Sequence, residues 1–377
     1  MHILAVDIGT GTQDILLYDS EREPENNLKM VMPSPTVLVA ERIREATRLG
    51  EAIVLTGVTM GGGPCAWAAE DHLRAGHAVF ATPDAARTFN DDLDEVAKIG
   101  VTVVSEDEAA RLTQARVVRM RDFDFDAVAS AFRAFHVSAR FDALAVGVFD
   151  HGAAPPGVSD RAFRFDYLAR RLEAVRPTDR GTREGQIAGS LAGFAFDRAD
   201  IPPIMTRLRA VAASAPNDIP LIVMDTAPAA VLGALGDPRV QNAQPVVVVN
   251  VGNFHTLAFH LGEGQVRGVF EHHTGLLSQE QLEGWLTKLA DGTISNEEVF
   301  AGHGHGALVL DPTPAGDSCL TAVIGPRRQM LHGSGLHPYF AVPHGDMMLA
   351  GCFGMVRAYR VLHPEAPVGQ MSAAGGQ

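Results

Sequence analysis

Short apolar runs alternate with polar loops along the chain, and this pattern predicts strands that alternate with helices. Residues 2–6, 52–58, 143–149 and 221–224 are apolar runs of the length typical of buried strands. The segment 126–135 instead places apolar side chains at the i, i+3, i+4 and i+7 spacing of one helix face. The alternation predicts an α/β fold.

A second series of strands begins near residue 245 and repeats the start of the chain. Residues 3–18 read ILAVDIGTGTQDILLY, and residues 246–261 read VVVVNVGNFHTLAFHL. Both have four apolar residues, then Asp or Asn, one apolar residue, Gly and a second strand. A further run at 266–270 predicts a three-stranded meander. The repeated unit predicts two like-folded halves that face a cleft.

Composition shifts suggest where the parts of the chain begin and end. We expect a first domain over 1–150 and a second domain over 245–363. The segment 151–244 is expected to hold an irregular insertion, rich in Pro, Arg and Gly at 153–193, and a connecting strand and helix. The Gly-, Ala- and Ser-containing segment 364–377 is expected to be a flexible tail.

The two turns of the repeat are candidate phosphate-binding sites. Glycine lets the backbone approach a ligand, while N–H and hydroxyl groups hold phosphate oxygens. The carboxylate of Asp7, at the end of the first strand, could hold Mg²⁺ through water. The candidate residues are Gly9, Thr10, Gly11 and Thr12 in the first turn, and Gly252, Asn253 and Thr256 in the second. An ordinary glycine hairpin is the alternative for either turn.

A third motif, LAGCFG at 349–354, lies in a helix expected over 347–362. Its small residues Gly351 and Gly354 would let a flat ring or a ribose approach the backbone, and a tightly packed helix–strand contact is the alternative. The segments DIGTGTQDILLYD, NVGNFHTLAFHL and AGCFGMVRA together resemble the phosphate-1, phosphate-2 and adenosine segments of the actin, sugar-kinase and heat-shock-chaperone ATPase superfamily.

This resemblance implies two ribonuclease-H-like domains, the actin-like ATPase fold, with ATP and Mg²⁺ in the cleft between them. It implies that Asp7 lies near the metal, the two turns near the phosphates, and Gly351 and Gly354 near adenosine. The superfamily normally has an aspartate where this chain has Asn250, and a Gly-Gly pair where it has Ala350-Gly351.

The whole chain also resembles a prokaryotic family labelled "putative pyruvate formate-lyase activating enzyme". Glycyl-radical activases bind a [4Fe–4S] cluster through CxxxCxxC. The three cysteines, Cys65, Cys319 and Cys352, are too far apart in sequence to form that motif. The sequence therefore argues against taking the label literally.

Charge and hydropathy exclude several other classes of protein. The net charge of −14, from 31 basic and 45 acidic side chains, argues against a nucleic-acid partner. No glycine-rich loop ends in Gly-Lys-Ser/Thr, so a Walker-type P-loop is absent. The N-terminal MHILAVD is unlike a signal peptide, and no apolar run is long enough to span a membrane. We expect a cytoplasmic protein whose partner is a small-molecule nucleotide.

Histidines and strand-end aspartates supply a second set of candidates. His272, His273, His303 and His305 could bind a transition metal, because neutral imidazoles suit such ions; polar lining or surface turns are the alternative. Asp150 and Asp225 follow strands and, like Asp7, are candidate catalytic groups.

The sequence thus favours an ATP-dependent phosphotransferase or ATPase with an unknown substrate. Two alternatives stay open. One is a histidine-rich metal-dependent enzyme, and the other is a binding protein that does not hydrolyse ATP, which Asn250 makes credible.

Overall fold

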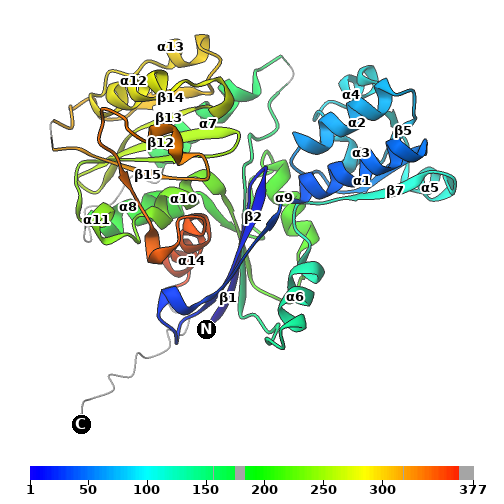
Figure 1. The fold of residues 1–377 in the computed structure, drawn as a ribbon, viewed down its shortest axis with the longest axis horizontal. Helices are drawn as coiled ribbons and strands as arrows, with labels where there is room; N and C mark the ends of the chain where they lie inside the picture. Colours follow the sequence, from blue (N-terminus) through cyan, green and yellow to red (C-terminus); the bar gives the residue numbers. More distant parts are fainter. Residues whose placement is uncertain (156, 175–182, 317, 365–377) are drawn as a thin grey trace.

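The computed structural model describes residues 1–155, 157–174, 183–316 and 318–364. The described chain forms two six-stranded sheets, a four-stranded sheet and the helices that cover them (Figure 1). The predicted α/β class is confirmed. Residues 365–377, most of the expected tail, lie outside the described part of the chain.

The first large sheet has the strand order β3-β2-β1-β8-β10-β9. Its strands are β1 (His2–Ile8), β2 (Thr12–Asp19), β3 (Leu28–Pro33), β8 (Ala143–Val148), β9 (Ala195–Asp197) and β10 (Leu221–Asp225). β1, β2 and β3 form an antiparallel meander, and β8 and β10 run parallel to β1. β8 is apolar and buried along its whole length, as a central strand covered on both faces should be.

The second large sheet has the order β14-β13-β12-β11-β15-β16 and repeats five strands of the first, a three-stranded meander followed by two parallel strands. Its sixth strand, β14, lies beside β13, whereas β9 of the first sheet lies beside β10 at the opposite edge. Its strands are β11 (Val246–Val251), β12 (His255–Gly262), β13 (Gln265–His273), β14 (Gly306–Val309), β15 (Leu320–Ile324) and β16 (Tyr339–Phe340). β11, β12 and β13 form the predicted meander, and β15 and β16 continue it in parallel. Residues 7 and 14 pair across the first hairpin, and residues 250 and 257 across the second. The predicted repeat is therefore a structural one.

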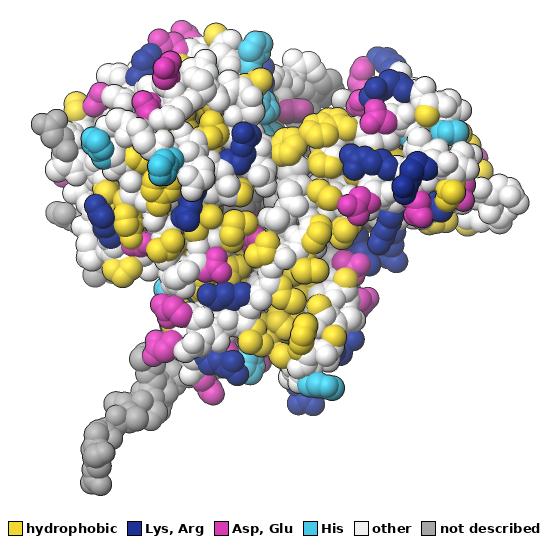
Figure 2. All heavy atoms as spheres, viewed as in Figure 1, with side chains coloured by type: hydrophobic (Ala, Val, Ile, Leu, Met, Phe, Trp, Pro, Cys, Tyr) yellow, Lys and Arg dark blue, Asp and Glu magenta, His cyan; other side chains and the backbone are white. Residues whose placement is uncertain are grey.

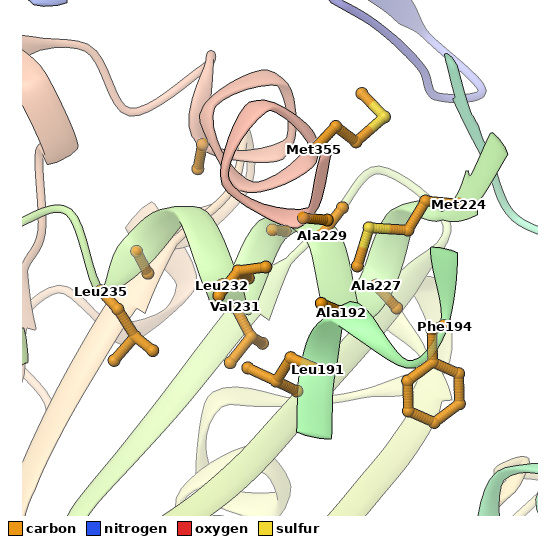
Figure 3. Packing of buried hydrophobic residues seen from close by; sticks show 14 of the residues in the cluster. Leu191, Ala192, Phe194, Met224, Ala227, Ala229, Val231, Leu232, Leu235 and Met355 are labelled. Carbon is orange, nitrogen blue, oxygen red and sulfur yellow. The ribbon is translucent and has the colours of Figure 1, made fainter. Parts of the chain in front are cut away.

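A layer of helices lies between the two large sheets. It consists of α8 (Arg183–Ala192), α10 (Thr226–Ala234) and α14 (Ala350–Leu362), and one apolar cluster joins these helices to both sheets. Figure 3 shows Ala229 of α10 directly beside the coil of α14. Glycine permits this approach, because a Cβ on Gly354 would lie 1.8 Å from the Ala229 carbonyl oxygen.

Other helices cover the outer faces of the large sheets. α6 (Phe125–Ala134) and α9 (Thr206–Ser214) pack on the first sheet, and α12 (Gln279–Ala290) packs on the second. The remaining helices of the two halves are α7 (Asp160–Ala174), α11 (Pro238–Asn242) and α13 (Asn296–Ala301), with the 3₁₀ turns η1 (Pro24–Asn26), η2 (Thr274–Leu276), η3 (Arg328–Leu331) and η4 (Pro343–Gly345). No helix of the described residues has the length and apolar character needed to cross a bilayer.

Residues 34–122 form a small body of their own, inserted between β3 and α6 and seen on the right of Figure 1. Its parallel sheet has the order β6-β5-β4-β7, and it has a separate apolar core. The strands are β4 (Ile53–Gly57), β5 (Val79–Ala81), β6 (Thr102–Val103) and β7 (Arg116–Met120). The helices are α1 (Pro35–Leu49), α2 (Pro64–Arg74), α3 (Pro83–Ala86), α4 (Leu93–Ile99) and α5 (Glu106–Arg111).

The structure differs from the sequence-based division of the chain in two places. The segment 153–193, expected to be irregular, contains α7 and α8 within its described residues. β9 and β10 complete the first sheet although they follow the expected boundary at residue 150. Strand order depends on pairings between distant segments, which local composition does not report.

Candidate functional site

A pocket of about 130 Å³, with both polar and apolar lining, lies where the turns of the two repeated hairpins face each other. The turns are built alike: the Gly9 N–H donates to the Thr12 carbonyl and the Gly252 N–H to the His255 carbonyl, both at 2.9 Å. The turns also meet, since a Cβ on Gly11 would lie 2.6 Å from Asn253 Nδ2. The lining includes Gly9, Thr10, Thr12, Gly252, Asn253 and Phe254 from the turns, and Asp7, Asp14, Thr226 and Asn250 beside them.

Two buried carboxylates form one wall of this pocket. Asp7 and Asp14 are directly opposite each other on β1 and β2, and the Thr226 hydroxyl donates to Asp7 Oδ1 at 2.5 Å. Burial raises the pKa of Asp7 to about 7 and, together with the charge of Asp7, raises that of Asp14 to about 8. Asp14 Oδ1 is buried without a hydrogen-bond partner. Both observations fit a site where a hard cation would stabilise the ionised pair.

Arg207 on α9 brings a guanidinium group, ion-paired with Asp122, to the same pocket. Its guanidinium is held by Asp122, with Nε 2.7 Å from Oδ2, and by the Phe149 carbonyl oxygen at 2.6 Å from Nη1. Asp14 and Arg207 were not among the sequence candidates. Neither lies in a motif, and their proximity to Asp7 depends on strand pairing and on the packing of α9.

The small body closes one side of the two turns. The Ser34 hydroxyl donates to the Thr10 carbonyl oxygen at 2.6 Å, and the Trp67 and Phe254 ring centroids are 5.5 Å apart. A Cβ on Gly61 would lie 2.4 Å from Arg207 Nη2, so the glycine loop of this body lies against the Arg207 guanidinium. On the face seen in Figure 2, hydrophobic side chains gather between the large lobe and the small body.

The residues expected near adenosine are packed against protein. A Cβ on Gly351 would lie 1.8 Å from Asp7 Oδ2, and Gly354 lies against Ala229 as described above. The alternative of a helix–strand contact describes Gly351, which lies against β1, whereas Gly354 packs on the helix α10 and has no room for a ligand. Thr256 is also buried, shares a 3.0 Å hydrogen bond with Thr274, and is not among the residues that line the pocket.

Asp150 and Asp225, the other candidate catalytic groups, are held in structural interactions. The Asp150 carboxylate accepts hydrogen bonds from the N–H groups of Gly152 and Leu208, at 2.8 and 2.9 Å. Asp225 caps α10 and lies 2.6 Å from Nη1 of the buried Arg164. Neither aspartate lines the pocket.

Next to the pocket, three histidines converge from three elements. One ring nitrogen from each of His151, His255 and His305 lies within 4.8 Å of the other two. His273 lies at the edge of this group, with its ring centroid 4.5 Å from that of His305. Two other sequence candidates lie outside it: His272 bonds the Gly302 carbonyl oxygen at 3.0 Å, and His303 is exposed.

Glu271, which the sequence did not indicate, is fully buried beneath these rings. Its Oε1 lies 3.3 Å from His255 Nδ1 and 3.8 Å from His305 Nδ1, and its Oε2 accepts from Arg164 Nε at 2.8 Å. Burial opposes ionisation of Glu271, but the Arg164 charge outweighs it and lowers the pKa of Glu271 below its usual range.

Two meander-based halves that share a five-strand order, joined by a central helix layer and meeting at paired turns, define the actin-like ATPase fold. Residues 60–330 match the family described as "Putative pyruvate format-lyase activating enzyme (DUF1786)". The chain belongs to this family, as the resemblance predicted. The three cysteines do not support the activating-enzyme chemistry of the label, because Cys65, Cys319 and Cys352 lie in or against three different core clusters.

Solved structures with some likeness to the chain are distant. One is the ethanolamine utilization protein EutJ from Carboxydothermus hydrogenoformans, at 11% identity and TM-score 0.31, over 95% of this chain and 89% of that one. Another is the Lmo2764 protein from Listeria monocytogenes, described as "a putative N-acetylmannosamine kinase", at 11% identity and TM-score 0.35, over 97% and 100%. A comparison with curated proteins finds no match.

Proposed function

We propose that the chain binds a nucleoside triphosphate with Mg²⁺, with the phosphates in the pocket between the two turns, and transfers or hydrolyses the terminal phosphoryl group. The observation that supports this best is the meeting of two equivalent turns, one from each half, beside the Asp7–Asp14 pair. The pocket is small, about 130 Å³, which suits the phosphates and leaves the nucleoside outside it.

The residues have distinct roles in this proposal. The turn N–H groups, with the hydroxyls of Thr10 and Thr12, hold phosphate oxygens, and Arg207 adds a positive charge. Asp7 and Asp14 hold Mg²⁺, which neutralises charge on the phosphates in such reactions. Asn250 is the position equivalent to Asp7 in the other half, so both acidic groups come from the first hairpin.

Equilibrium binding of ATP, with and without Mg²⁺, tests the proposal. We expect Asp7→Asn to weaken the Mg²⁺-dependent part of binding by at least tenfold, and the exposed control Asp218→Asn to behave as wild type. Folded wild-type protein that binds no ATP would overturn the proposal.

Phosphate release measured on the same samples separates two outcomes. Turnover supports a phosphotransferase or ATPase. Tight binding without turnover, even with candidate acceptors, would favour a non-hydrolysing binding protein, as Asn250 suggests. A cytoplasmic location, where ATP and Mg²⁺ are available, stays a prediction.

A further inference from the structure

We propose that His151, His255 and His305 form a binding site for a divalent first-row transition-metal ion. This site is separate from the Mg²⁺ position at Asp7, and it does not depend on whether the chain binds ATP. The three side chains come from the loop after β8, the start of β12 and the loop before β14, so only the folded chain brings them together.

The spacing of the nitrogens suits one shared ion. His151 Nε2 and His305 Nε2 are 3.3 Å apart. Two imidazole nitrogens bound to one tetrahedral Zn²⁺ at about 2.0–2.1 Å are about 3.3 Å from each other. A direct hydrogen bond between the two rings is the competing explanation, and 3.3 Å is long for such a bond.

The atoms behind the rings give a second, independent observation. Glu271 Oε1, His255 Nδ1 and His305 Nδ1 are buried and have no hydrogen-bond partner of acceptable geometry. They face one another, as the distances of 3.3 and 3.8 Å show. A carboxylate beside Nδ1 favours the tautomer that leaves Nε2 free as a ligand, an arrangement common around bound metals. Glu271 is therefore a positioning residue for the site.

The chemistry of the donors selects the class of ion. Neutral imidazoles suit Zn²⁺, Fe²⁺, Co²⁺ or Ni²⁺ rather than Mg²⁺.

The surroundings also leave space for a further ligand. Three protein ligands leave a coordination position open, as in catalytic rather than structural zinc sites. His255 and Phe149 line the pocket between the two turns, so the three-histidine group adjoins that pocket. An oxygen of an anionic substrate is the ligand that this position would take.

Metal titration of the full chain, made without a polyhistidine tag and stripped with a chelator, tests the site. With ZnCl₂ or CoCl₂ as the probe, we expect one ion per chain by calorimetry and elemental analysis, and visible Co²⁺ absorption typical of nitrogen ligands. His305→Gln should weaken binding by at least about 100-fold. The matched control is His303→Gln, two residues away and exposed, which should bind as wild type does.

Circular dichroism first establishes that each variant is folded. If His305→Gln is not folded, His255→Gln decides, because its side chain is 22% exposed and tolerates substitution better. Wild-type protein that takes up no stoichiometric ion would overturn the proposal. Equal loss of binding in the His303 and His305 variants would also overturn it, since it would indicate surface histidines as the ligands.

Discussion

Replacing Gly354 by Ala should force apart the two helices that join the halves of the molecule. The new Cβ would lie 1.8 Å from the Ala229 carbonyl oxygen, whereas contacts of 3.4 Å or more are ordinary. No side-chain rotation relieves this contact, because the opposing atom belongs to the backbone of α10. Overpacking of a core costs about 1–3 kcal/mol, and a backbone clash of this size lies at or above the upper end.

The gain in helix propensity from Gly to Ala, about 1 kcal/mol, offsets part of this cost. We therefore expect Gly354→Ala to lower the free energy of unfolding by at least about 2 kcal/mol. The matched control is Gly284→Ala on α12, where a new Cβ meets nothing within 4 Å. That variant should be more stable than wild type by up to about 1 kcal/mol.

Urea denaturation followed by circular dichroism, with metal and nucleotide absent, measures both changes. Replacing Gly by Ala should thus lower the free energy of unfolding on α14 and raise it on α12. A Gly354→Ala variant as stable as wild type would refute the argument that this glycine serves helix packing.

Further predictions concern the buried charges. The raised pKa values of Asp7 and Asp14 mean that the metal-free protein loses stability as pH rises from about 4 to about 8. Asp14→Asn removes one of these groups. The free energy of unfolding of this variant relative to wild type should therefore increase by up to about 1.4 kcal/mol for each pH unit between about pH 5 and pH 7. Urea denaturation in EDTA measures this, and a pH-independent difference would contradict it. Arg164→Met leaves Asp225 and Glu271 buried without their cation and should cost about 3–5 kcal/mol. The exposed control Arg209→Met should change stability little, and similar losses in both variants would argue against the buried ion pairs.

The sequence predicted the parts of the fold that are encoded locally or by repetition. Apolar runs in the sequence predicted the strands β1, β8, β10 and β11. The shared hairpin pattern predicted that the two halves are alike. The inserted body at 34–122 was missed, because its short strands have the same local pattern as those of the large sheets. α7 was missed although Phe165, Leu168 and Leu172 share its buried face, since arginines dominate that segment.

The candidate site could be predicted only where chemistry lies within a motif. Asp7 and the two turns were singled out because glycine and carboxylate occur together in sequence, and residues of both turns line the pocket. Asp14 and Glu271 lie inside strands, where nothing local separates a buried functional carboxylate from a solvated one. The metal-ligand candidates from the sequence included His305 but not His151 or His255, because the proximity of the three arises only from the packing of the two halves.

The position of α14 has a consequence for how the protein is made. This helix, near the end of the chain, packs on β1 and β2, and Cys352 Sγ contacts the Asp14 carbonyl oxygen at 3.1 Å. During synthesis, the first half therefore lacks part of its core until residues 350–362 leave the ribosome. Until then, the apolar face of the first sheet is open to chaperones and to other nascent chains. A chain shortened before residue 350 should aggregate rather than yield an independent first half.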